Sequence, residues 1–385
     1  MGHIASHLIG EFGLNNNLRL GTLFGIPFFV NPSWFLVLGL VTLTYGQELT
    51  VFPQLTGITP WFLGLVTALL LFASVVAHEL GHSLLAIAQG IEVKSITLFL
   101  FGGLANLEKE SETPLEAFAV AIAGPLVSLI LCGLLTILGA NLNLSLPLPL
   151  QAIVALLAAI NLALALFNLI PGLPLDGGNI LKALVWQITG NQNKGILLAS
   201  RVGQVFGWLA IGVGSLGILR VLPVGDFWTV LVGWFLLQNA GFSARNVQVK
   251  ETMSAYTAQD AIIPNSPIVG EGLNLREFVN NYVIGKTPWR KFLVTNAIGQ
   301  LVGSLEVDAL KNIPTSDWTQ FSIHDVMQAP DQLKTVNATE SLFEVAQRLE
   351  KDKIPQLAVV KDSGELLGLL EKASIIQCLQ KPLAV

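Results

Sequence analysis

The chain has 385 residues, of which 52% are hydrophobic and only 12% are charged. Soluble domains carry about 25% charged residues, so this composition excludes an ordinary soluble protein and indicates a membrane protein. The net charge of −5 argues against nucleic acid as a partner, and the two cysteines argue against a disulfide framework or a thiolate metal site.

The charged residues are distributed unevenly along the chain. Residues 1–249 carry 8 Lys and Arg and 10 Asp and Glu, whereas the shorter remainder carries 13 and 16. A composition shift of this kind marks a domain boundary. We therefore expect a membrane domain over residues 1–247 and a soluble domain over residues 248–385.

Long apolar runs with few charges predict about six transmembrane helices, because a helix needs about 20 apolar residues to cross a bilayer. We expect them at residues 32–48, 60–89, 114–139, 150–170, 198–221 and 226–243. The β-branched and aromatic residues of 91–107 instead predict a short strand or hairpin, either partly re-entrant or at the surface. The loops at 49–60 and 140–150 carry no Lys or Arg, so the positive-inside rule predicts cytoplasmic chain ends.

The second predicted helix carries the sequence His78-Glu79-Leu80-Gly81-His82 in its later half. Helical residues four apart share one face, so both imidazoles can bind one metal ion. Glu79 follows His78, so its side chain lies beside the metal ion and is not aimed at it. A base that takes a proton from a zinc-activated water is expected there. HExxH on a helix is typical of zinc peptidases. Structural histidines are the alternative, but ionisable groups inside a bilayer are functional candidates by default.

A third zinc ligand is expected from another segment, because catalytic zinc keeps three protein ligands and one open position. Asp176 is the candidate: apart from Glu79, it is the only acid in the spans that is not at a loop or a charged collar. A helix break with Pro171 and Pro174 precedes it and would direct its carboxylate into the helix bundle. The alternative is that Asp176 only caps the next helix.

The C-terminal part contains an internal repeat. Residues 292–306 match residues 357–371 at a constant offset of 65, with Gly299 and Gly364 at equivalent positions. Each copy predicts a strand, a glycine turn, a second strand and then a helix. Repeated units of this size bury their apolar faces against each other.

Taken together, these motifs resemble the site-2 protease family of intramembrane zinc metalloproteases. The order and spacing are similar to its sporulation-type subgroup, which has six spans and a C-terminal pair of CBS motifs. The tail repeat resembles such a pair. The stretches that carry the resemblance are His78 to His82, Phe101 to Gly103, Ala123 to Pro125 and Asn168 to Gly178.

The resemblance implies a role for each motif. It implies one zinc ion per chain with His78, His82 and Asp176 as ligands, and Glu79 as the catalytic base. Asn168 would orient the substrate or stabilise the oxyanion, although the residue type also suits a simple helix break. The strand with Gly102 and Gly103 would hold the substrate peptide in an extended form. The family cleaves transmembrane segments, which implies regulated intramembrane proteolysis.

The implied fold class is a mainly α-helical polytopic membrane domain with a short re-entrant β element, followed by a soluble α/β CBS-pair domain. The implied partners are a transmembrane protein substrate, the lipid bilayer and a second copy bound through the CBS pair. The implied location is a bacterial cytoplasmic membrane, or else a cyanobacterial or plastid membrane. A CBS-gated transporter or channel is the alternative, but residues 1–247 lack the repeated halves that it requires.

The CBS positions that usually bind an adenosine nucleotide differ here. Nucleotide-binding copies carry Thr or Ser and then Asp three residues later. This sequence has Glu306 and Ala309 in one copy, and Glu371 and Ser374 in the other. Because a carboxylate repels ribose-phosphate oxygens, nucleotide binding is disfavoured at both copies, and dimerisation or contact with the membrane core is the alternative mode of regulation.

Overall fold

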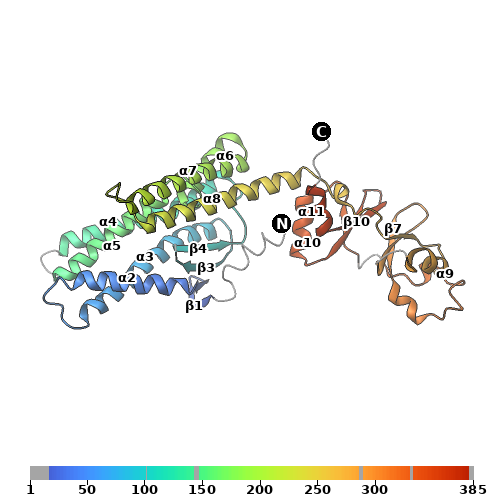
Figure 1. Ribbon diagram of the computed structural model, residues 1–385, viewed down its shortest axis with the longest axis horizontal. Coiled ribbons are helices and arrows are strands. Elements are labelled where there is room, and N and C mark those ends of the chain that lie inside the picture. Colours follow the sequence, from blue (N-terminus) through green and yellow to red (C-terminus); the bar gives the residue numbers. More distant parts are fainter. Residues whose placement is uncertain (1–16, 101, 143–146, 286–288, 330–332, 381–385) are drawn as a thin grey trace. The chain divides into compact units, whose positions relative to one another are not determined.

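The computed structural model describes residues 17–380 except residue 101 and segments 143–146, 286–288 and 330–332 (Figure 1). Phe101 therefore lies outside the described residues. The chain forms two compact units, and the boundary between them falls after Val247. Long helices dominate the first unit, whereas two small sheets with short helices form the second.

Each predicted span corresponds to one long helix of the described chain. These helices are α2 (Ser33–Leu49), α3 (Thr59–Ala88), α4 (Pro114–Leu142), α5 (Leu148–Asn168), α7 (Gln192–Ile218) and α8 (Phe227–Ser254). A shorter helix, α6 (Asp176–Thr189), lies between α5 and α7. Four of the helices (α3, α4, α5 and α7) are long and apolar enough to cross a membrane. Spans at α2 and α8 stay predictions.

Two helix ends differ from the sequence prediction, and local chemistry explains both. Helix α7 begins at Gln192, six residues early, because Asn191 Oδ1 accepts a hydrogen bond from Lys194 N at 3.1 Å and caps the helix. Helix α8 continues from residue 243 to Ser254. The apolar run ends there, but no Gly or Pro interrupts residues 242–254, so the polar segment remains helical.

Small residues let α3 pack closely against its two neighbours. A Cβ atom on Gly64 would lie 2.6 Å from the carbonyl oxygen of Thr42 in α2. A Cβ atom on Gly81 would lie 2.9 Å from the carbonyl oxygen of Ala123 in α4. Membrane helices commonly approach one another at such residues. The glycine inside the HExxH motif thus fixes α3 against α4 at the level of the histidines.

A four-stranded sheet covers part of this bundle. Its strands are β1 (Leu18–Leu23), β2 (Ile26–Val30), β3 (Val93–Phe99) and β4 (Gly102–Leu107), in the order β1-β2-β3-β4. The β3–β4 hairpin confirms the prediction for residues 91–107, while its re-entrant position in the membrane stays a prediction. Sequence reasoning missed β1 and β2, because β1 is exposed along its whole length and shows no buried face. Strand β4 is an edge strand.

The second unit confirms the predicted repeat. Its sheets contain β5 (Ile268–Gly270), β6 (Lys291–Thr295) and β7 (Leu301–Glu306), and then β8 (Thr335–Asn337), β9 (Gln356–Val360) and β10 (Leu366–Glu371). In both sheets the first pair of strands is parallel and the second is antiparallel. The two glycine turns pair with each other, since Leu366 N donates to Gly299 O at 2.9 Å and Leu301 N to Gly364 O at 3.3 Å.

The helices that accompany the two sheets differ between the copies. Helix α10 (Leu342–Lys351) matches the shorter α9 (Leu275–Phe278). Helix α11 (Lys372–Gln380) follows β10, but only a 3₁₀ segment, Val307–Asn312, follows β7. Pro314 limits the length of the segment after β7, because proline disfavours the helical conformation of Ile313 before it.

Candidate active site

Helix α3 presents both histidines of the motif on one face. His78 is 3% exposed, and its Nε2 lies 3.3 Å from Nε2 of His82. The spacing of four residues accounts for this, since it returns the chain to nearly the same side of the helix. The two nitrogens that could bind a metal ion therefore point at one place.

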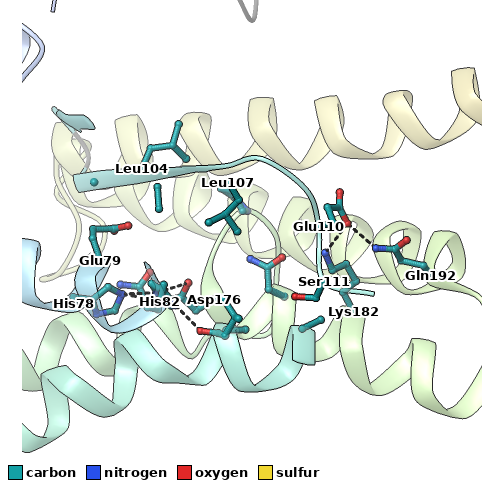
Figure 2. Close-up of a pocket in the computed structure, with 18 residues that line it drawn as sticks. His78, Glu79, His82, Leu104, Leu107, Glu110, Ser111, Asp176, Lys182 and Gln192 are labelled. Carbon is teal, nitrogen blue, oxygen red and sulfur yellow. Dashed lines mark hydrogen bonds and ion pairs between the residues drawn. The ribbon is translucent and has the colours of Figure 1, made fainter. Parts of the chain in front are cut away.

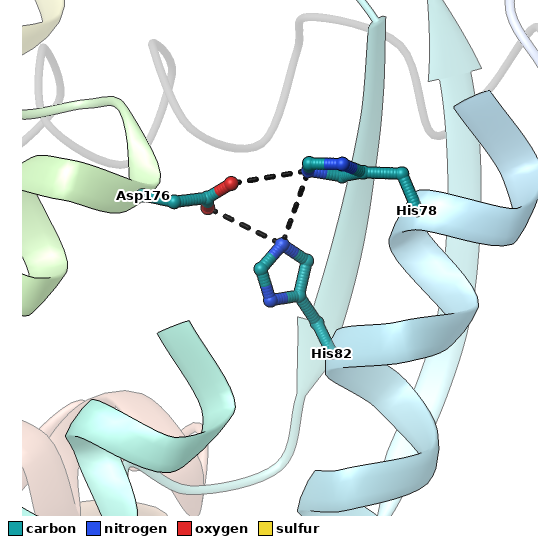
Figure 3. Close-up of side chains that lie close together, drawn as sticks. All are labelled: His78, His82 and Asp176. Atoms are coloured by element: carbon teal, nitrogen blue, oxygen red, sulfur yellow. Dashed lines mark hydrogen bonds and ion pairs between the residues drawn. The ribbon is translucent and has the colours of Figure 1, made fainter. Parts of the chain in front are cut away.

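Asp176 reaches the same place from the start of α6 (Figure 3). Its Oδ2 lies 3.0 Å from His78 Nε2, and its Oδ1 lies 3.3 Å from His82 Nε2. The ligand atoms of the three residues all lie within 4.8 Å of one another. Asp176 is the first residue of α6 and not its N-cap, and no side-chain hydrogen bond caps the helix. The carboxylate thus faces the histidines and not its own backbone.

The two glycines after Asp176 explain how this carboxylate is held in position. A Cβ atom on Gly177 would lie 2.3 Å from the carbonyl oxygen of Leu169, and one on Gly178 would lie 2.2 Å from the nitrogen of Leu173. The loop that leaves α5 therefore folds directly beneath the start of α6. Only glycine fits at these two positions, so the Asp-Gly-Gly sequence fixes where α6 begins.

Polar partners outside the cluster orient both imidazoles. His78 Nδ1 lies 2.9 Å from Ser128 Oγ, and His82 Nδ1 lies 2.7 Å from the carbonyl oxygen of Val120. A carbonyl cannot donate, so Nδ1 of His82 carries a proton, and in the neutral ring this leaves a lone pair on Nε2. That lone pair faces a carboxylate oxygen of Asp176. Such convergence of acceptors is favourable when a cation lies between them.

The donor set and its dimensions fit zinc. Zinc binds His nitrogen and Asp oxygen at about 2.0–2.2 Å in tetrahedral geometry, which separates neighbouring ligand atoms by about 3.3 Å. The two Nε2 atoms lie 3.3 Å apart here, and each lies 3.0 or 3.3 Å from a different carboxylate oxygen of Asp176. Three ligands with held outer nitrogens are the arrangement of a catalytic zinc site, which leaves one position open.

Gly124 forms part of this site, although sequence reasoning assigned it no role there. A Cβ atom on Gly124 would lie 2.2 Å from Nε2 of His82 and 2.7 Å from Nε2 of His78. The backbone of α4 therefore passes directly against the two converging Nε2 atoms. The available signal was the Ala123-Gly124-Pro125 sequence inside an apolar helix, where a glycine costs helix stability and usually serves close packing.

The three residues lie in the wall of a cavity of about 300 Å³ (Figure 2). Glu79 also lines it, next to Gly103 of β4, where a Cβ atom would lie 2.4 Å from Glu79 Cγ. Strand β4 therefore passes directly over the predicted base. The cavity is lined by His78, Glu79, His82, Gly103, Leu104, Ala105, Leu107, Glu110, Ser111, Ala117, Val120, Ala121, Asn168, Pro174, Asp176, Asn179, Lys182 and Gln192.

Of the two remaining predicted residues, Asn168 lines the cavity and Gly102 does not. Asn168 lines the cavity, and its Nδ2 donates to the carbonyl oxygen of Leu164 at 3.1 Å. Because an amide nitrogen carries two hydrogens, one N–H of Asn168 remains for a ligand. Gly102 starts β4 but does not line the cavity. The structure thus brings every predicted site residue except Gly102 to one cavity.

Ser128→Ala should weaken zinc binding about 10- to 100-fold, because loss of an outer hydrogen-bond partner typically has that effect on a histidine ligand. Competition with a chelator of known affinity measures the change in the purified protein. Ser83→Ala is the matched control, since Ser83 is also fully buried and its Oγ has no hydrogen-bond partner in the described chain. Equal weakening in both variants would contradict the role of Ser128.

Two family profiles match this chain, one in each of its two units. The profile of peptidase family M50 matches residues 66–146 and 143–211, which include both histidines and Asp176. The CBS domain profile matches residues 323–381, in the second copy of the repeat.

Two zinc metalloproteases match nearly the whole of this chain, and a solved protease matches part of it. The candidate zinc metalloprotease sll0528 of Synechocystis is 71% identical over 371 residues, which cover 96% of this chain and 97% of that protein. The candidate zinc metalloprotease Rip3 of Mycobacterium tuberculosis is 28% identical over 367 residues. The match covers 94% of this chain and 92% of Rip3. The solved site-2 protease of Methanocaldococcus jannaschii is 29% identical, with a TM-score of 0.44, and covers 60% of this chain and 95% of its own.

Proposed function

Because this chain belongs to peptidase family M50, the site-2 proteases, we propose that this membrane zinc metalloprotease hydrolyses peptide bonds within or near transmembrane segments of other proteins. His78, His82 and Asp176 hold one zinc ion per chain. The convergence of their ligand atoms within 4.8 Å is the observation that carries this proposal. The substrates are membrane proteins whose cleavage releases a regulatory domain.

The chemistry divides between the metal and the chain. His78, His82 and Asp176 would hold the zinc ion, which when bound would supply Lewis-acid chemistry at the scissile carbonyl and would lower the pKa of water. Glu79 accepts a proton from the attacking water and delivers it to the leaving amine nitrogen, so that the carbon–nitrogen bond breaks and a carboxylic acid and an amine form. Asn168 directs its free N–H toward the carbonyl oxygen of the substrate.

Strand β4 holds the substrate. A transmembrane helix must unwind before its peptide bonds become accessible, and each freed backbone group then needs a new partner away from water. Strand β4 is hydrogen-bonded to β3 alone among the described strands, so its other edge offers these partners. Gly103 adds no side chain between this edge and Glu79, which supports delivery of the scissile bond to the base.

The active site lies toward the cytoplasmic side of a bacterial-type membrane. Lys94, Lys109, Lys182, Lys194 and Arg245 lie in or next to the segments assigned to that side. The CBS pair regulates cleavage by self-association or by contact with the membrane domain, and its residues disfavour a nucleotide at both copies. At the positions that usually bind a nucleotide, Lys291 Nζ lies 3.5 Å from Glu306 Oε1, and the Ser374 hydroxyl donates to the carbonyl oxygen of Glu371 at 2.9 Å, so both positions have partners within the chain.

Removal of zinc should abolish cleavage reversibly. We expect purified protein treated with 1,10-phenanthroline to lose all measurable cleavage of a synthetic transmembrane peptide, and one equivalent of zinc to restore it. Metal analysis should give one zinc per chain. Cleavage that persists without bound zinc would contradict the proposal, as would metal-independent ion flux through proteoliposomes with no cleavage, which indicates a transporter.

A further inference from the structure

The cavity has a second polar end, away from the metal-site residues (Figure 2). Asn179 and Lys182 follow Asp176 along α6 at intervals of three residues, and both line the cavity. Helical residues three apart are neighbours on one face. At a rise of 1.5 Å per residue, Lys182 lies about 9 Å from Asp176 along the helix axis. This face of α6 thus connects the metal site to a cationic side chain.

Lys182 carries a charge that is largely removed from solvent. Its side chain is 14% exposed, and its Nζ lies 3.5 Å from Oε2 of Glu110. Gln192 donates from Nε2 to the same oxygen at 2.6 Å. A shielded ammonium group needs an anionic partner to offset its lost hydration. Apart from the histidines, Lys182 is the one basic residue among the described residues that line the cavity.

Glu110 is the exchangeable member of this group. Its side chain is 69% exposed, and it lies in the segment between β4 and α4 that has no regular structure. Lys182 and Gln192 belong to two helices in close contact, since a Cβ atom on Gly195 would lie 2.4 Å from the carbonyl oxygen of Lys182. The two helices therefore form a rigid carboxylate site, and a loop residue occupies it.

We propose that Lys182 and Gln192 form a specificity subsite for an acidic side chain of the substrate, and that Glu110 fills this subsite in the free enzyme. The inference rests on the proposed peptidase function. An extended strand advances about 3.3 Å per residue, so 9 Å corresponds to roughly three residues from the cleaved bond. The acidic side chain displaces Glu110 and pairs with Lys182, which does not touch the reacting atoms.

The test uses the full-length protein in detergent and synthetic transmembrane peptides that differ at one position, three residues to either side of the cleaved bond. Wild type should cleave the Asp peptide with a kcat/KM about 10-fold higher than the Asn peptide, mainly through KM, because charge-assisted hydrogen bonds are the stronger ones. Lys182→Glu should instead prefer a Lys peptide, and Lys182→Met should show no preference. Glu110→Gln should lower KM for the Asp peptide only.

The neighbouring ion pair supplies matched controls. Lys109 Nζ and Glu112 Oε1 lie 2.5 Å apart in the same segment, and neither residue lines the cavity. Lys109→Glu and Glu112→Gln should keep the wild-type preference. Equal cleavage of Asp and Asn peptides by wild type, or an unchanged preference in a zinc-loaded Lys182→Glu variant, would overturn the subsite alone. A wild type that cleaves no peptide would overturn the peptidase proposal and the subsite with it.

Discussion

A Glu79→Gln variant should cleave transmembrane substrates at least about 100-fold more slowly than wild type while it binds zinc with unchanged affinity. Glutamine keeps the size and the acceptor oxygen of the side chain but cannot take up a proton. Removal of a positioned general base typically lowers a rate by about 10²- to 10⁴-fold. Glu79 touches Gly103 and is not among the three residues whose ligand atoms converge.

The measurement combines single-turnover cleavage of a transmembrane peptide with metal analysis of the same sample. Glu48→Gln is the control, because Glu48 is exposed near the end of α2 and does not line the cavity. It should leave rate and zinc content unchanged. Full activity of Glu79→Gln would exclude the assigned base, and loss of its zinc would make Glu79 a ligand. A Glu79→Gln variant that binds zinc but does not cleave should also retain the natural substrate, so that the substrate can be identified.

Gly124→Ala should remove zinc from the protein although Gly124 offers no ligand atom. The added methyl group would lie 2.2 Å from Nε2 of His82 and 2.7 Å from Nε2 of His78. Neither ring can move away freely, because their Nδ1 atoms are held by Val120 and Ser128. We expect zinc affinity to fall by more than about 100-fold, beyond the usual effect of losing one outer partner.

Gly133→Ala is the matched control for this substitution. Gly133 lies on the same helix, α4, and a Cβ atom there would meet nothing within 4 Å. Gly133→Ala should retain zinc and activity, and should if anything favour the helix, since alanine is the better helix former. Zinc content and thermal unfolding of both variants decide the question. Gly124→Ala with wild-type zinc affinity would contradict the described packing of α4.

The periodic and compositional signals in the sequence were sufficient for the long helices, the β3–β4 hairpin and the paired sheets of the second unit, but not for β1 and β2. Apolar runs located six long helices, because the length of such a run is a local property of the chain. The offset of 65 residues located the paired sheets of the second unit, since both copies follow the same local rules. The histidines four residues apart likewise required only the helical period to share a face.

Only the tertiary structure decided which distant residues complete the site. It brought Asp176 within 3.0 Å of His78, across 98 positions of sequence. It also brought Gly124, Ser128 and the carbonyl oxygen of Val120 against the two histidines. None of these residues carries a periodic signal, and a serine or glycine in an apolar helix is compatible with many roles. Their function depends on which face of α4 meets α3.

The hairpin of β1 and β2 and the ion pair of Lys182 also depend on contacts between elements and not on local sequence. Strand β1 lacks an alternating buried face, so its place in the sheet follows from pairing with β2 and not from its own sequence. From the sequence, Lys182 was predicted only to be a positive charge on the cytoplasmic side. Its second role arises because α6, α7 and the loop after β4 meet at one end of the cavity. Local periodicity determines elements, whereas contacts between elements determine a site.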